Sequence, residues 1–286
     1  MTDKNTPLRR QVDRSGYAFN MAVAAAIRRS SAHQKWECLG TEVPWSTKLS
    51  RSSGFIDVLI ARDRAVGVIE CKKTNVSDRL VFLTEQGQPA TEPRCRLQVY
   101  LQEPPEEPKR SFAVSAAFSQ RWKPRFAVAD CTMPTGSPES GYCVAPKDKQ
   151  NLNLDAMASE LLASCDGLLG NWDVNLPADY VAAVPIIVTN AQLFTCSFDP
   201  ERADLGSGDI PDDAVFERRP FVRFRKALGG SGGMTSPSKV ELGDVAAEEE
   251  RTVFVVDSRE LISFLASFRR LLMPLEDGAC QLVSDS

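Results

Sequence analysis

Asp57, Glu70 and Lys72 are the residues of this chain whose types and spacing best fit a chemical site. Asp57 lies within the apolar run 55–61, and Glu70 follows directly after the apolar run 65–69. Both runs are rich in Val and Ile and have the length of strands, so a β-hairpin is predicted. A hairpin closed symmetrically about the two-residue break places Asp57 opposite Glu70, with Cβ atoms roughly 4.5–5.5 Å apart, and Lys72 emerges on the same face.

Two carboxylates at this separation repel each other unless a cation lies between them or one of them takes up a proton. Hard oxygen ligands suit Mg²⁺, which binds through one or two carboxylates plus waters, and Mn²⁺ is expected to substitute. The Cys71 carbonyl, between Glu70 and Lys72, is a further expected ligand. The alternative is a surface hairpin with exposed ion pairs, but the acids interrupt strands that are otherwise predicted to be buried.

An acid on one strand followed by Glu-x-Lys at the end of the next resembles the PD-(D/E)xK motif of the restriction-endonuclease-like nuclease superfamily. Ile56 stands where that motif carries its proline. The resemblance covers residues 15–75 and implies an α/β fold with an αβββαβ core, in which helices flank a central mixed sheet. It implies a Mg²⁺-dependent endonuclease that hydrolyses DNA phosphodiester bonds, with Asp57, Glu70 and Lys72 as catalytic residues.

The elements before the hairpin agree with that order. Residues 15–29 predict a helix with Ser15 as its N-cap, and an alanine-rich face indicates close packing on a sheet. Asn20 occupies the position where the resemblance implies an additional Glu, so a second metal is not expected. Residues 36–45 predict the first strand, in which Glu42 is either a further ligand or an exposed strand acid.

After the hairpin the pattern is less regular. A nuclease-like core is predicted over 8–198, with an insertion at about 76–150 and a C-terminal extension over 199–286. The expected helices are 153–169 and 258–272, and the expected strands are 182–189, 192–198, 221–226 and 252–256. Asp257 and Glu260 match the D-x-x-E form of a capping arrangement for the last helix.

Arg121, Trp122, Lys123 and Arg125 combine basic side chains with an aromatic ring. Such a segment can hold a nucleic-acid backbone while the indole stacks on a base. The alternative is a loop whose tryptophan fills the core. Residues 1–75 hold thirteen Lys and Arg against seven Asp and Glu, and the remainder holds twenty-one against thirty-one. The basic excess therefore coincides with the hairpin, which favours phosphate-bearing substrates, although a solvated basic helix face has the same composition.

The composition excludes several other classes. No apolar run is long enough to cross a membrane, and the polar start is not a secretory signal. The eight cysteines form no C-x-x-C motif, which predicts reduced thiols in a cytoplasmic protein. His33 is the only histidine, which excludes His-pair zinc sites and makes the G-x-S-x-G string at 229–233 a linker.

Two functions remain from the sequence. The first is an endonuclease in restriction, defence or repair, whose partner is DNA, with RNA as a further possible substrate and a homodimer or partner subunit as a possible assembly. The second is a catalytically inactive nuclease-fold module that binds nucleic acid or a protein partner. The intact Asp57, Glu70 and Lys72 favour the first function, and Asn20 favours the second.

Overall fold

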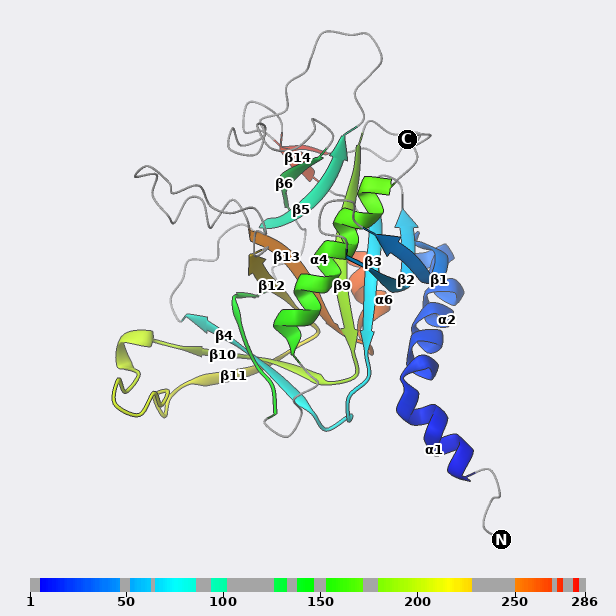
Figure 1. Ribbon diagram of the computed structural model, residues 1–286. Helices are drawn as coiled ribbons and strands as arrows, with labels where there is room; N and C mark the ends of the chain where they lie inside the picture. The colour runs from blue at the N-terminus through cyan, green and yellow to red at the C-terminus, as the bar shows by residue number, and fades with distance from the viewer. Residues whose placement is uncertain are drawn as a thin grey trace.

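The computed structural model describes residues 6–46, 52–62, 65–85, 94–101, 126–132, 138–146, 153–171, 180–227, 250–268, 272–274 and 280–282. The fold is mixed α/β, with a central mixed sheet flanked by helices (Figure 1). The helical elements are α1 (Thr6–Ser15), α2 (Tyr17–Gln34), α4 (Leu154–Asn171), α6 (Leu261–Ser267) and the 3-10 turn η1 (Pro200–Arg202).

The strands fall into two sheets. The central sheet contains β1 (Glu37–Ser46), β2 (Ser53–Arg62), β3 (Ala65–Lys72), β5 (Arg94–Leu101), β6 (Phe126–Thr132), β7 (Glu139–Ser140), β9 (Tyr180–Thr189), β12 (Phe221–Ala227), β13 (Glu250–Asp257), β14 (Leu272–Pro274) and β15 (Cys280–Leu282). The second sheet has the order β11 (Val215–Arg219), β10 (Gln192–Phe198), β4 (Arg79–Glu85) and β8 (Tyr142–Val144).

The predicted hairpin register is confirmed along the paired part of β2 and β3. Val58 lies opposite Ile69, and the pairing continues to Arg62 opposite Ala65. β1 pairs antiparallel with the other edge of β2, so β1, β2 and β3 form a meander. This register follows from the short polar break between two Val- and Ile-rich runs, because a one-residue slip would move the buried side chains to the other face.

β9 is the strand around which the central sheet divides. It pairs in parallel with the whole of β3 along one side. Its first residues pair with β5 on the other side, and its last residues, from Ile186 to Thr189, pair in parallel with β13. The C-terminal ends of β3, β9 and β13 therefore lie side by side at one edge of the sheet.

Two apolar clusters cover the two faces of the central sheet. On one face, α2 and α6 pack on strand residues that include Val58, Ile60 and Ile69. On the other face, α4 packs on residues that include Val66 and Val68. Figure 1 shows α4 crossing one face of the sheet, with α2 beside β1 and β2. The alternation of β3 side chains between these clusters explains why its apolar run is nearly continuous.

Three sequence predictions differ from the structure. α2 begins after Gly16, whose φ of 82° is in the left-handed region, whereas Ser15 ends α1 and its hydroxyl donates to the Val12 carbonyl. The last helix is short and begins at Leu261; Asp257 accepts from the Arg259 backbone N–H, but its carboxylate also binds the side chains of two arginines. The described parts of 76–150 contain strands of both sheets, which that irregular sequence did not predict.

The C-terminal part of the chain contributes to the central sheet through β12 and β13. The division of the chain at residue 198 stays a prediction. In the residues that the structure describes, no helix combines the length and the apolar character needed to span a membrane.

Gly167 allows α4 to approach the end of the β1–β2 hairpin. A Cβ at this position would lie 2.8 Å from Cε3 of Trp45 and 3.0 Å from the Ser46 carbonyl oxygen. We expect Gly167→Ala to lower the free energy of unfolding by about 1–3 kcal/mol, because backbone must move to relieve the contact. Chemical denaturation measures the change.

Gly141→Ala is the control, since its Cβ would lie 3.8 Å from the nearest atom, the end of the Arg225 side chain. We expect a change within about 0.5 kcal/mol for this variant. Equal unfolding free energies for wild type and Gly167→Ala would contradict the close contact.

Candidate functional site

The candidate site lies where β2 and β3 separate. Their pairing stops at Val58 and Ile69, one position short of the predicted pair Asp57 and Glu70. Beyond this point β2 stays paired with β1, and β3 stays paired with β9. The two acids therefore lie at the fork between the strands and not in a regular cross-strand pair.

A change in the alternation of β2 accompanies the separation. Ile56 packs in the cluster with α4, whereas Val58 packs in the cluster with α2 and α6. Residues two apart in a regular strand share a face, so the chain rotates at Asp57. This rotation turns the Asp57 carboxylate toward β3.

The Asp57 carboxylate is held by two N–H donors. Its Oδ2 accepts from the Cys71 backbone N–H at 2.7 Å, in place of a ladder bond, and its Oδ1 accepts from Asn20 Nδ2 at 2.8 Å. Burial raises the pKa of Asp57 above its ordinary value of 3.8. The Cys71 N–H and the Asn20 amide oppose that rise, because hydrogen bonds to a carboxylate favour its charged form.

Glu70 carries the larger perturbation. Burial, followed by the charges of Asp57 and Glu160, raises the pKa of Glu70 from 4.5 to about 8, and Lys72 opposes the rise. Val66 and Val68 pack against the α4 side, so alternation places Glu70 and Lys72 on that side too. The fork therefore brings the three predicted catalytic residues together.

Glu42 adds a third strand to the acidic group. The ladder pairs Thr41 with Val58 and Val43 with Ile56, which leaves Glu42 across from Asp57. Its backbone φ is 51°, a left-handed conformation that costs a non-glycine residue roughly 1–2 kcal/mol. Glu42 is exposed, and its charge raises the pKa of both Asp57 and Glu70. Glu42 is thus the exposed strand acid of one sequence interpretation, and its role as a further ligand stays a prediction.

Cys71 points away from the acids. Its side chain is buried in the cluster with α2 and α6, and burial raises the pKa of its thiol well above 9.0, with Asp57 and Glu70 contributing. A neutral, buried thiol is a poor nucleophile, so its contribution is made by its backbone. The Cys71 N–H orients Asp57. The role of its carbonyl as a metal ligand stays a prediction.

The donor set fits a hard cation that keeps part of its water shell. The two acids offer oxygen ligands, and because burial and then the charge of Asp57 raise the pKa of Glu70, a bound cation would favour its ionised form. Within the described residues, no group of three or more His, Cys, Asp or Glu side chains is arranged to hold a metal by itself. Mg²⁺ binds through one or two carboxylates plus waters, so Asp57 and Glu70 are the residues that could hold one, and the cofactor stays a prediction.

Two residues of the site were not selected as site residues from the sequence. Glu160 is an exposed residue of α4 whose charge affects Glu70 only because α4 crosses β3. Asn20 was noted as a replacement for an acid, whereas it donates a hydrogen bond to one. Arg121, Trp122, Lys123 and Arg125 lie outside the described residues, and their role stays a prediction.

No protein-family model, no curated protein and no solved structure matches the chain.

Replacement of Glu42 separates its charge from its backbone strain. We expect Glu42→Gly to be more stable than Glu42→Ala by about 1 kcal/mol, because both variants lose the charge but glycine alone accepts a positive φ without strain. Chemical denaturation with a chelator present gives the comparison. An alanine variant as stable as the glycine variant would show that the left-handed conformation is not retained.

The perturbed Glu70 predicts a dependence of stability on pH. Since its folded pKa of about 8 exceeds its ordinary value of 4.5, the folded state binds the proton more tightly. The metal-free protein should therefore lose stability as pH rises through this window, at roughly 1.4 kcal/mol for each pKa unit before solvent screening.

Glu70→Gln should flatten this dependence, because the amide does not ionise. Denaturant unfolding between pH 5 and pH 8 in chelator measures it, with the exposed Glu37→Gln as control. Parallel curves for wild type and Glu70→Gln would mean that Glu70 is not buried beside another acid.

Proposed function

We propose that the chain is a metal-dependent endonuclease that hydrolyses phosphodiester bonds in DNA. The observation that carries the proposal is the fork, where Asp57 and Glu70 come together at the end of paired strands with Lys72 on the same side as Glu70. Half-buried acids that repel each other lower stability without a cation, which is a reason to assign them a role in binding one.

The order of elements supports the same proposal. α2, β1, β2 and β3 are followed by α4 and by β9, which is parallel to β3. This is the order helix, three strands, helix and strand that the resemblance implies, with β4 to β8 between β3 and α4. The specific nuclease core remains part of the proposal.

Asp57, Glu70 and the Cys71 carbonyl would hold one Mg²⁺, or Mn²⁺ in its place. When bound, such an ion polarises a phosphate and lowers the pKa of a coordinated water. Asn20 and the Cys71 N–H keep the Asp57 carboxylate in one orientation, which reduces the reorganisation needed for binding. Lys72 places an ammonium beside Glu70, where it attracts the scissile phosphate and offsets the charge that develops on its oxygens.

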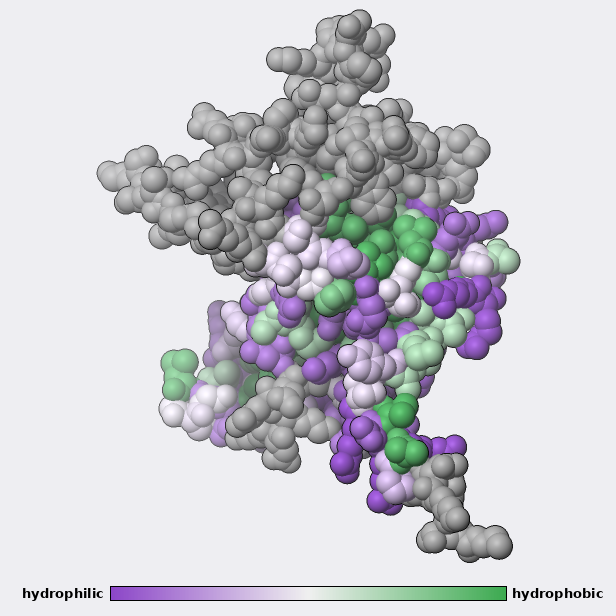
Figure 2. Space-filling view, turned by 45° about the vertical axis from the view of Figure 1, so that its right-hand side comes forward, coloured by the Kyte–Doolittle hydropathy of each residue, from purple (hydrophilic) through white to green (hydrophobic). Residues whose placement is uncertain are grey.

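The helix α1 provides basic groups for the flanking backbone. Arg9, Arg10 and Arg14 are exposed, and the ammonium of Lys73 donates to the Asp13 carbonyl, which connects α1 to the end of β3. In Figure 1, α1 extends away from the sheet below the ends of β3 and β9. Figure 2 shows hydrophilic side chains, together with some hydrophobic ones, along this helix. A basic helix in this place favours a polyanionic substrate.

The second candidate is a nuclease-fold module without catalysis. Asn20 favours it, since an amide stands where a further carboxylate would strengthen metal binding. The two candidates differ in metal dependence, because a binding module requires no divalent cation to act on nucleic acid.

Single substitutions at the fork test the proposed catalysis. Asp57→Ala and Glu70→Ala should abolish cleavage of plasmid DNA in Mg²⁺ while the protein stays folded, because removal of one acid relieves repulsion. Lys72→Ala should bind the metal but lose roughly a hundredfold or more in turnover, as expected for a preorganised electrostatic group. Binding of DNA should persist in all three, since phosphate contacts are spread over many basic groups.

The exposed Glu37→Gln is the matched control, and it should retain cleavage. Plasmid and single-stranded DNA are assayed with Mg²⁺, with Mn²⁺ and with chelator, and circular dichroism checks the fold. DNA binding by the wild type without metal-dependent cleavage would favour the second candidate. Undiminished cleavage by a fork variant would place the chemistry elsewhere.

A further inference from the structure

One row of residues connects the fork to a second polar group. Lys72 pairs with Thr189 across β3 and β9, and Thr189 pairs with Asp257 across β9 and β13. Side chains two or four positions before each of these residues, in the same strand, pack in the apolar cluster with α4. Because residues two apart in a strand share a face, all three lie on the α4 side of the sheet. Strands are about 4.8 Å apart, which separates Lys72 and Asp257 by about 10 Å.

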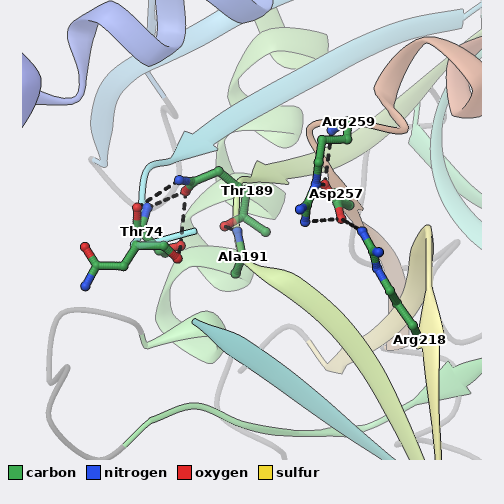
Figure 3. Close-up of polar contacts among 8 residues, drawn as sticks. Thr74, Thr189, Ala191, Arg218, Asp257 and Arg259 are labelled. Atoms are coloured by element: carbon green, nitrogen blue, oxygen red, sulfur yellow. Dashed lines mark hydrogen bonds and ion pairs between the residues drawn. The ribbon is translucent and has the colours of Figure 1, made fainter. Parts of the chain in front are cut away.

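Asp257 is the anchor of that second group. Its side chain is 1% exposed. Its Oδ1 accepts from Arg259 Nε at 2.7 Å and its Oδ2 from Arg259 NH2 at 2.5 Å, and Arg218 NH2 lies 3.5 Å from the same Oδ2. Figure 3 shows the two guanidinium groups meeting at Asp257, with Thr189 between this group and Thr74.

The two arginines come from different parts of the fold. Arg218 belongs to β11 of the second sheet, and Arg259 follows β13 of the central sheet. Their side chains are 54% and 41% exposed, so each guanidinium keeps surface on the solvent side while Asp257 fixes it from behind. A planar guanidinium has five N–H donors in a fixed arrangement, and one carboxylate can accept hydrogen bonds from only some of them.

The charges around the group leave Arg218 better able than Arg259 to bind an additional anion. Asp257 offsets one of the two positive charges, and the nearby Glu260 acts on Arg259. Arg218 forms the longer of the two ion pairs and has the more exposed side chain. An ion pair that long and that exposed contributes little to stability, so structural support alone is a weak account of Arg218.

We propose that Arg218 and Arg259 form a phosphate-binding subsite that aligns the substrate strand along the C-terminal ends of β3, β9 and β13. The subsite rests on the proposed function, because it takes a phosphate of the same nucleic acid whose scissile bond lies at the fork. A separation of about 10 Å corresponds to roughly three base-pair steps measured along the axis of a duplex. Planar guanidinium groups suit the tetrahedral oxygens of a phosphodiester.

The salt dependence of DNA binding tests this subsite. The full chain is titrated with a fluorescent 20-base-pair duplex, with chelator present, at several salt concentrations. Arg218→Ala should weaken binding and make the log–log salt slope shallower by roughly 0.9, the value for one lost phosphate contact. Arg218→Lys should keep most of that slope, because the charge is retained.

Arg202→Ala is the matched control, since Arg202 is 55% exposed and pairs with Asp213 in the segment that connects β10 and β11 of the second sheet. Its slope should equal that of the wild type. An unchanged slope for Arg218→Ala, an equal loss for Arg202→Ala, or no binding by the wild type would overturn the subsite. Binding with the predicted slopes but without metal-dependent cleavage would support the subsite and overturn the nuclease function. Metal-dependent cleavage with an unchanged slope for Arg218→Ala would support the nuclease function and overturn the subsite.

Discussion

Repulsion between two half-buried carboxylates is the constraint on which the arrangement at the fork depends. Asp57 meets it with two N–H donors, one from the Cys71 backbone and one from Asn20. Glu70 meets it with a raised pKa, which means that it holds a proton near neutrality when no cation is present. The Cys71 N–H is available to Asp57 only because β2 leaves β3 at this position. The separation of the strands and the ionisation of the acids are thus two aspects of one local structure.

The elements around the fork are arranged so that each layer contributes one group. α2 contributes Asn20, β1 contributes Glu42 and α4 contributes Glu160. The row from Lys72 to Asp257 extends the same face across two further strands, and β11 reaches it from the second sheet through Arg218. Parallel strands end at one edge of a sheet, so residues distant in sequence collect there without any one segment carrying the site.

The sequence predicted local features better than tertiary ones. The hairpin register could be predicted because a short break and Val- and Ile-rich runs determine it. The fork could not, because it depends on β1 and β9 holding their neighbours apart. Asp257 was predicted only in part for the same reason: it accepts from the Arg259 backbone N–H, as the D-x-x-E pattern suggests, but its carboxylate is also bound by Arg218, 39 residues away in sequence. The left-handed backbone of Glu42 likewise could not be predicted from the sequence, because glutamate rarely adopts that conformation.

The central position of β9 determines when the sheet can form. Its partner β3 precedes it by more than a hundred residues, and its partner β13 follows it by about seventy. During synthesis β3 must therefore wait with one edge unpaired, and β9 waits in turn for β13. Sheets that depend on such distant pairings fold slowly, and their open edges favour aggregation. The acids at the fork between β2 and β3 thus acquire their final surroundings only after most of the chain has left the ribosome.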